Sequence, residues 1–161
     1  MTRTAFTLLG LLVFMSAEPA RAETITFAAA AGGEPPAAFE FFRTGQGSPG
    51  KWTIVQDQSA ESGWALEQSS ADKTDYRFPL AVYKPFDGTN VDVQIRFKPV
   101  SGTVDQAGGI VVRYLSPDNY YVVRANALEN NVRFYRVVKG KRSSSAPRTP
   151  KSPRTSGMPS D

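Results

Sequence analysis

The stretch GIVVRYLSPDNYYVVRANALENNVRFYRVV, residues 109–138, decides the fold of this chain. It contains three runs rich in Val, Tyr and Arg, at residues 109–115, 119–128 and 131–138. Between them stand Ser-Pro-Asp-Asn and Glu-Asn-Asn, whose residue types favour tight turns. Short strands joined by tight polar turns are typical of an antiparallel meander in a sandwich or jelly roll.

A further strand is expected upstream, where VDVQIRFKPV occupies residues 91–100. Its apolar side chains alternate with polar ones, which predicts a strand with one buried face and one wet face. Other runs predict strands at residues 24–27, Trp52–Gln56, Trp64–Gln68 and Arg77–Tyr83. No amphipathic helix of useful length is visible. The predicted fold class is therefore all-β, an antiparallel jelly roll or β-sandwich.

The composition excludes several kinds of chemistry. The 161 residues include no Cys and no His. Disulfides, thiolate metal sites, zinc hydrolysis and Ser-His-Asp catalysis are therefore ruled out. Any chemistry must use carboxylates, Tyr, Lys, Arg or an oxygen-bound metal. We expect no cofactor and no metal site, with a calcium ion as the alternative left open.

The positive charge lies in the C-terminal tail. The formal net charge is +4, of which residues 1–22 contribute +1 and residues 139–161 contribute +5, so residues 23–138 carry −2. The tail lacks interleaved aromatic residues, and the body has no basic surface to support it. We therefore expect no nucleic-acid partner.

The chain opens like a secretory signal peptide. Arg3 precedes the apolar run AFTLLGLLVFM, and Ala20-Arg21-Ala22 forms an A-x-A cleavage site. The apolar run is too short to span a bilayer as a helix. We expect residues 1–22 to be removed, the mature chain to begin at Glu23, and the protein to be periplasmic or secreted. No membrane contact is expected after cleavage, and the oligomeric state is left open.

The last 19 residues, 143–161, differ sharply from the strands before them. They contain four Pro, six Ser, two Arg and one Lys, and neither an aromatic nor a β-branched aliphatic residue. Such a segment buries too little apolar surface to offset its ordering entropy, so we expect a disordered basic tail.

Three pieces of residues 105–142 carry a resemblance to a known family: DQAGG at 105–109, DNYY at 118–121 and RANALENN at 124–131. The chain resembles the 3-keto-disaccharide hydrolase domain family, bacterial exported domains with a concanavalin A-like lectin/glucanase jelly roll. Proteins of that family continue with several more strands after the position of Arg142. The resemblance therefore implies that residues 23–142 are the N-terminal part of a jelly roll. It would then have unpaired edges and an uncovered apolar face that includes Val91, Val93, Ile95 and Phe97.

The resemblance also suggests an origin for the tail. Codons permitted for KSPRTSGM, residues 151–158, read V-A-A-N-E-W-H in a shifted frame. That string is similar to the strand with which the family resumes. We interpret residues 143–161 as a frameshift product, and a natural disordered extension or an unrelated C-terminus stays open as an alternative.

The candidate substrate-binding residues are Arg113, Tyr120, Arg124 and Asn126. On regular strands Arg113, Arg124 and Asn126 would share one wet, concave sheet face, where they could bond sugar hydroxyls while Tyr120 stacks on a ring. Equally, the arginines could be solvated outward positions or partners in cross-strand ion pairs. For Asn126 the family resemblance implies a functional or a turn-forming role.

No catalytic residue can be assigned from the sequence. Asp105, Asp118 and Glu129 are expected at strand ends, and paired carboxylates are what glycoside hydrolysis requires. The E-x-D-x-x-E motif of family 16 glucanases is absent, and Asp118 is expected in a turn. Two functions remain: an exported hydrolase of 3-keto-disaccharides, as the resemblance implies, or a non-catalytic carbohydrate-binding or surface-interaction module of lectin type. A non-functional truncated product is the third alternative.

Overall fold

A computed structural model describes residues 22–30 and 33–144. This part of the chain is all β, with eight strands, one short 3-10 helix and no α-helix. In chain order the elements are η1 (Ala28–Ala30), β1 (Phe39–Gly45), β2 (Trp52–Gln56), β3 (Trp64–Gln68), β4 (Arg77–Tyr83), β5 (Ala107–Ser116), β6 (Asn119–Asn126), β7 (Asn131–Val138) and β8 (Lys141–Ser144). The expected signal peptide, apart from Ala22, and the tail beyond Ser144 lie outside the described residues. Over the residues described, no helix is long and apolar enough to cross a membrane.

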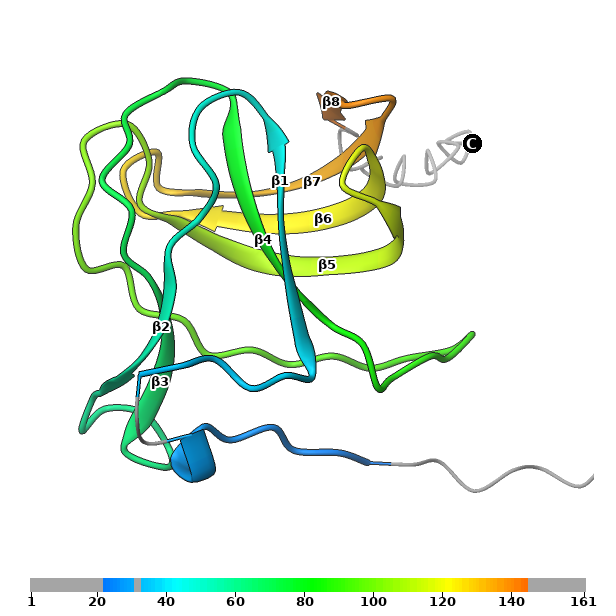
Figure 1. Ribbon diagram of the computed structural model, residues 1–161. Coiled ribbons are helices and arrows are strands. Elements are labelled where there is room, and N and C mark those ends of the chain that lie inside the picture. Colours follow the sequence, from blue (N-terminus) through cyan, green and yellow to red (C-terminus); the bar gives the residue numbers. More distant parts are fainter. Residues whose placement is uncertain (1–21, 31–32, 145–161) are drawn as a thin grey trace, which may run out of the picture.

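The strands form three antiparallel sheets (Figure 1). The largest is a four-stranded meander in the order β5-β6-β7-β8, and the other two are the pairs β1-β4 and β2-β3. The predictions for β2, β3, β4 and β7 are confirmed to the residue, and β5 and β6 lie where strands were expected. The all-β, antiparallel class is therefore confirmed.

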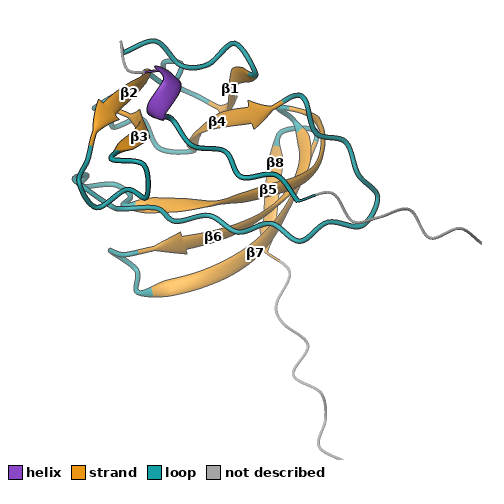
Figure 2. Ribbon diagram, turned by 90° about the horizontal axis from the view of Figure 1, so that it is seen from below, coloured by secondary structure: helices purple, strands orange, loops and turns teal. Residues whose placement is uncertain are grey.

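The two main layers pack face to face. In Figures 1 and 2, β1 and β4 cross over one face of the β5–β8 sheet, which we call its inner face. The buried side chains of Leu80, Tyr120 and Val137 form the core between the layers, and Phe42 and Val122 pack against them. Alternation along β6 and β7 thus directs every second residue into the sandwich.

A polar contact joins the two layers at one end of this core. Thr44 on β1 is fully buried, and its hydroxyl donates a hydrogen bond to the Pro117 carbonyl at 2.5 Å. The Tyr120 hydroxyl in turn donates to Thr44 Oγ1 at 2.9 Å. Burial raises the pKa of Tyr120. Because both hydroxyls are hydrogen-bonded, these bonds offset the cost of burying the two polar groups.

An irregularity in β5 changes which residues face the core. The β5–β6 register shifts between Val112 and Ser116, and Arg113 has φ of 51°. The bulge places Tyr114 beside the core, next to Phe42 and Tyr120, while Arg113 is exposed. Burial raises the pKa of Tyr114 to about 12. The regular alternation expected for Arg113 is therefore wrong: β5 has three residues, and β6 has one, between the pairs Val112–Tyr121 and Ser116–Asn119, and this irregularity changes which side chains of β5 face the core.

The last strand is held by aromatic side chains. Lys139 and Gly140 have φ of 50° and 72°, so they form the tight two-residue turn that joins β7 to β8. The Arg142 N–H donates to the Tyr76 hydroxyl at 2.5 Å, and the Arg142 guanidinium lies over Phe78, 4.2 Å from the ring centroid. β8 continues to Ser144, two residues beyond the boundary expected at Arg142.

The strand expected at residues 91–100 is absent from the structure. This segment runs beneath β5 in Figure 1 without a turn or bend, outside any sheet. Its backbone makes no hydrogen bond to any described residue. The alternating pattern is present, but a strand also needs a paired backbone, which the described residues do not supply. The strand expected at residues 24–27 is likewise wrong, and β1 was not anticipated.

The apolar side chains of residues 91–104 are correspondingly exposed. Val91, Val93, Ile95 and Phe97 are between 43% and 54% exposed, as expected for an uncovered face. Among the described residues, fifteen large apolar side chains are exposed, against five hydrophobic residues that are buried. At roughly 25 cal/mol per Å² of apolar surface buried, so small a core leaves little margin over conformational entropy.

We predict that the monomer unfolds over a broad temperature range and binds the dye ANS before it unfolds. Exposed apolar surface and a small core are the physical reasons. Replacing Val93 and Ile95 together by Thr should lower the ANS fluorescence and leave the far-UV circular dichroism unchanged. A sharp, reversible calorimetric transition of the dilute monomer, with equal calorimetric and van't Hoff enthalpies, would contradict this prediction.

Candidate functional site

Five polar side chains meet where β6 ends and β7 begins. They are Asp105, Arg124, Asn126, Glu129 and Asn131, which we call the Arg124 cluster. β6 supplies the two buried members, its turn to β7 supplies Glu129, and β7 begins with Asn131. Asp105 arrives from the segment before β5, 19 residues earlier in the chain than Arg124. The antiparallel pairing of β5, β6 and β7 brings all five together.

Arg124 is the centre of the cluster. It is only 9% exposed, and it lies between two carboxylates that are partly open to water. Its guanidinium donates to Glu129 Oε2 at 2.5 Å and to Asp105 Oδ1 at 3.4 Å. The guanidinium carbon also stands 5.5 Å from the centroid of the Tyr135 ring. Two counterions and a ring face therefore offset the cost of burying this charge.

Asn126 ties three segments of backbone together. It is 1% exposed, and its amide donates to Asp105 Oδ1 at 2.5 Å. Its side-chain oxygen accepts from the Leu128 N–H at 3.0 Å and from the Gln106 N–H at 3.4 Å. The side chain therefore fixes the turn after β6 and the entry to β5. This geometry matches the turn-forming alternative stated for Asn126.

Three of the four predicted substrate-binding residues share a face, and the fourth does not. Tyr120, Arg124 and Asn126 project from the same side of β6, as the alternation predicted. That side is turned into the sandwich, so the expectation of a wet, open face is wrong. β1 and β4 cover it at one end, and the carboxylates cover Arg124 at the other. Arg113 is separated from this face by the β5 bulge.

The electrostatics of the cluster favour an ionised carboxylate at Glu129. The Asn131 amide donates to Glu129 Oε2 at 3.0 Å, and together with Arg124 it lowers the pKa of Glu129. A general acid in glycoside hydrolysis needs a raised pKa. Asp118 lies at the other end of the sheet, in the turn between β5 and β6. The arrangement at Arg124 is thus an ionic clamp, and it is not built as an acid–base pair.

A shallow pocket of about 310 Å³ opens beside the cluster. We call it the turn pocket. Its lining combines an aromatic ring, small apolar side chains and amides, and consists of Phe97, Ala125, Asn126, Ala127, Asn130, Asn131 and Val132. The Phe97 ring lies against Gly108, where an added Cβ would stand 2.5 Å from the ring. Gly108 therefore allows the ring to reach this end of the sheet.

Asn130 is the amide in the turn pocket that is free to meet a ligand. It is exposed, it has φ of 48°, and its side chain makes no hydrogen bond within the described part of the chain. Asn131 is already engaged by Arg124 and Glu129. The sequence showed the Asn-Asn pair only as a turn signal. The role of Phe97 was not visible, because it depends on an irregular segment crossing Gly108.

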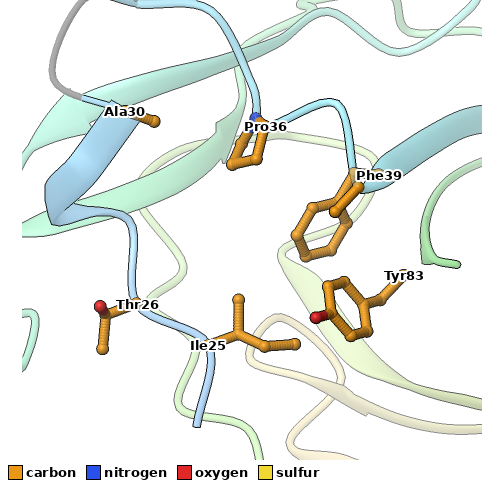
Figure 3. Close-up of a pocket in the computed structure, with 7 residues that line it drawn as sticks. Ile25, Thr26, Ala30, Pro36, Phe39 and Tyr83 are labelled. Carbon is orange, nitrogen blue, oxygen red and sulfur yellow. The ribbon is translucent and has the colours of Figure 1, made fainter. Parts of the chain in front are cut away.

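A second concavity lies near the N-terminal segment (Figure 3). It measures about 360 Å³ and is lined by Ile25, Thr26, Ala30, Pro36, Ala38, Phe39 and Tyr83. The lining is mostly apolar. In Figure 3 the rings of Phe39 and Tyr83 form one side, with their centroids 5.2 Å apart. With few polar groups to orient a ligand, this pocket offers less for specific recognition than the turn pocket.

The described residues form no candidate metal centre, and comparisons with known proteins identify no relative that would indicate the role of the site. Over residues 22–30 and 33–144, no group of three or more acidic side chains is placed to hold a metal ion. No family model matches the chain, and no curated protein or solved structure is significantly similar to it. The site must therefore be interpreted from its own geometry.

We predict that Glu129 titrates below its ordinary pKa of 4.5 and returns toward it when its donors are removed. Asn131→Ala removes the hydrogen bond that contributes most, and Arg124→Met removes the next. Arg133→Met, which removes the smallest of the lowering contributions, serves as the comparison and should raise the pKa of Glu129 least. Carboxyl-carbon NMR titration measures each pKa. Because the folded-state pKa is lowered, the interaction stabilises the fold above pH 4.5 and is lost on acidification through the folded-state value. An unperturbed Glu129 in the wild type would contradict this account.

Proposed function

We propose that this chain is an exported carbohydrate-binding module of lectin type, and that it binds a saccharide in the turn pocket without hydrolysing it. The observation that supports this most is the combination of an exposed aromatic ring, Phe97, with the unengaged amide of Asn130 in one pocket. Sugars present apolar C–H faces and hydroxyl groups, which suit an aromatic side chain and an amide.

The pocket volume agrees with a small ligand. About 310 Å³ is at the low end of the range of roughly 300–1,000 Å³ that is usual for small-molecule sites. One or two sugar rings would fill it, and its open form would leave the remainder of a longer glycan in solvent. The family resemblance suggests a disaccharide oxidised at C3 as the first ligand to try.

Binding is favoured over hydrolysis because of what surrounds Arg124. Hydrolysis needs one carboxylic acid that keeps its proton and one carboxylate that attacks or activates water. Asp105 and Glu129 both serve as counterions of the same guanidinium, and the pKa of Glu129 is lowered. Their role in this proposal is to hold Arg124 and Asn126 in place, so that the turn carrying Asn130 keeps its shape.

We predict that Asn130→Gly weakens saccharide binding about tenfold, since it removes one directed hydrogen bond. Glycine tolerates the positive φ of this position, so the turn itself is preserved. Lys139→Gly is the matched control, because it makes the same kind of change at a positive-φ turn residue outside the turn pocket. Isothermal titration with a 3-keto-disaccharide and with its unoxidised parent measures both variants.

Two outcomes would overturn the proposal. One is the absence of saturable binding to these disaccharides and to a broad glycan array. The other is release of monosaccharides from the 3-keto substrate that is lost in Glu129→Gln, which would favour the hydrolase implied by the resemblance. Equal loss of affinity in Asn130→Gly and Lys139→Gly would show that the turn pocket is not the binding site.

A further inference from the structure

Residues 91–97 have the features of a strand that lacks only its partner. The segment is straight, all seven residues are exposed, and no backbone group in it bonds to a described residue. Its apolar side chains still alternate with polar ones. Unpaired N–H and C=O groups beside exposed apolar side chains form a template for pairing with another strand.

We infer that the partner is the same segment of a second copy of this chain, paired antiparallel about Gln94 to form a two-fold symmetric dimer. In this register each residue stands opposite the one at the same distance on the other side of Gln94. Val91 then faces Phe97 of the second copy, and Val93 faces Ile95. Antiparallel partners project to the same side of a sheet, so apolar residues meet apolar residues throughout.

Charge complementarity selects this partner and this register. Asp92 stands opposite Arg96 of the second copy, and symmetry repeats the pair. Within the described residues neither Asp92 nor Arg96 has an ion-pair partner, whereas Lys98 is already bound to Asp57 at 2.8 Å. A shift of one residue in each copy would place Asp92 opposite Lys98 instead, and would leave Arg96 opposite Gln94. The centred register therefore satisfies both free charges.

The proposal does not require carbohydrate binding, but it shares Phe97 with the turn pocket. Strand pairing joins backbones edge to edge, while side chains project above and below the new sheet. It would cover backbone groups and apolar side chains that the single chain leaves exposed. An interface of this size is small, so we expect a reversible dimer that forms with increasing concentration.

Reversing single charges tests the pairing. The association is measured by sedimentation velocity at protein concentrations from about 5 to about 500 µM, because a small interface gives a weak dimer. Asp92→Arg and Arg96→Asp should each weaken the dimer at least tenfold, because like charges then face each other. An equimolar mixture of the two single variants should dimerise again, as should the double variant. Lys98→Gln is the control and should leave the association unchanged.

A cysteine at the symmetry axis gives a second, independent test. The chain has no Cys, so Gln94→Cys introduces a single thiol that should face its own copy. Cross-strand Cα atoms about 4.5–5.5 Å apart lie within reach of a disulfide. Gln94→Cys should form a covalent dimer on mild oxidation, and the exposed Ser101→Cys should not. A wild-type chain that stays monomeric, single variants that dimerise unchanged, or equal cross-linking at both positions would overturn the inference.

Discussion

Backbone pairing is the constraint on which the rest of this structure depends. β5, β6, β7 and β8 satisfy it by joining neighbouring runs through tight turns, and their pairing gives the sheet an inner face. Once that face exists, Tyr120 and Val137 are directed to the same side, where Leu80 from the second layer can cover them. Residues 91–100 meet the same constraint without a partner in the described chain, and they remain outside the sheets although their side-chain pattern suits one.

The candidate site lies where the pairing of β6 with β7 ends. Arg124 is buried there, and the carboxylates of Asp105 and Glu129 balance its charge. With these groups committed to one another, the parts left to meet a ligand are the turn residue Asn130 and the ring of Phe97. In the proposed function, this buried ionic clamp supports an exposed surface that binds the ligand. This separation of roles is the physical basis for proposing binding in preference to hydrolysis.

The sequence predicted local features better than long-range ones. β7 was predicted to the residue because its strand-favouring residue types and its flanking turns are both local features of the sequence. The burial of Arg124 was not predictable, since one of its counterions, Asp105, lies 19 residues away and is brought close only by the β5–β6 register. Arg113 was misplaced because nothing in the run GIVVRYL, residues 109–115, indicates the register shift between Val112 and Ser116. For residues 91–100, periodicity described the two faces of a strand and carried no information on whether a neighbour would pair with it.

Amide hydrogen exchange tests this account most directly, when it is measured residue by residue in dilute, monomeric protein. The account predicts strong protection at Val122 and Val137, in the centre of the β5–β8 sheet. It predicts exchange close to the unprotected rate for the amides of residues 91–97. Protection of residues 91–97 equal to that of β6 in the monomer would contradict the account, because it would mean that this segment already has a strand partner within the single chain.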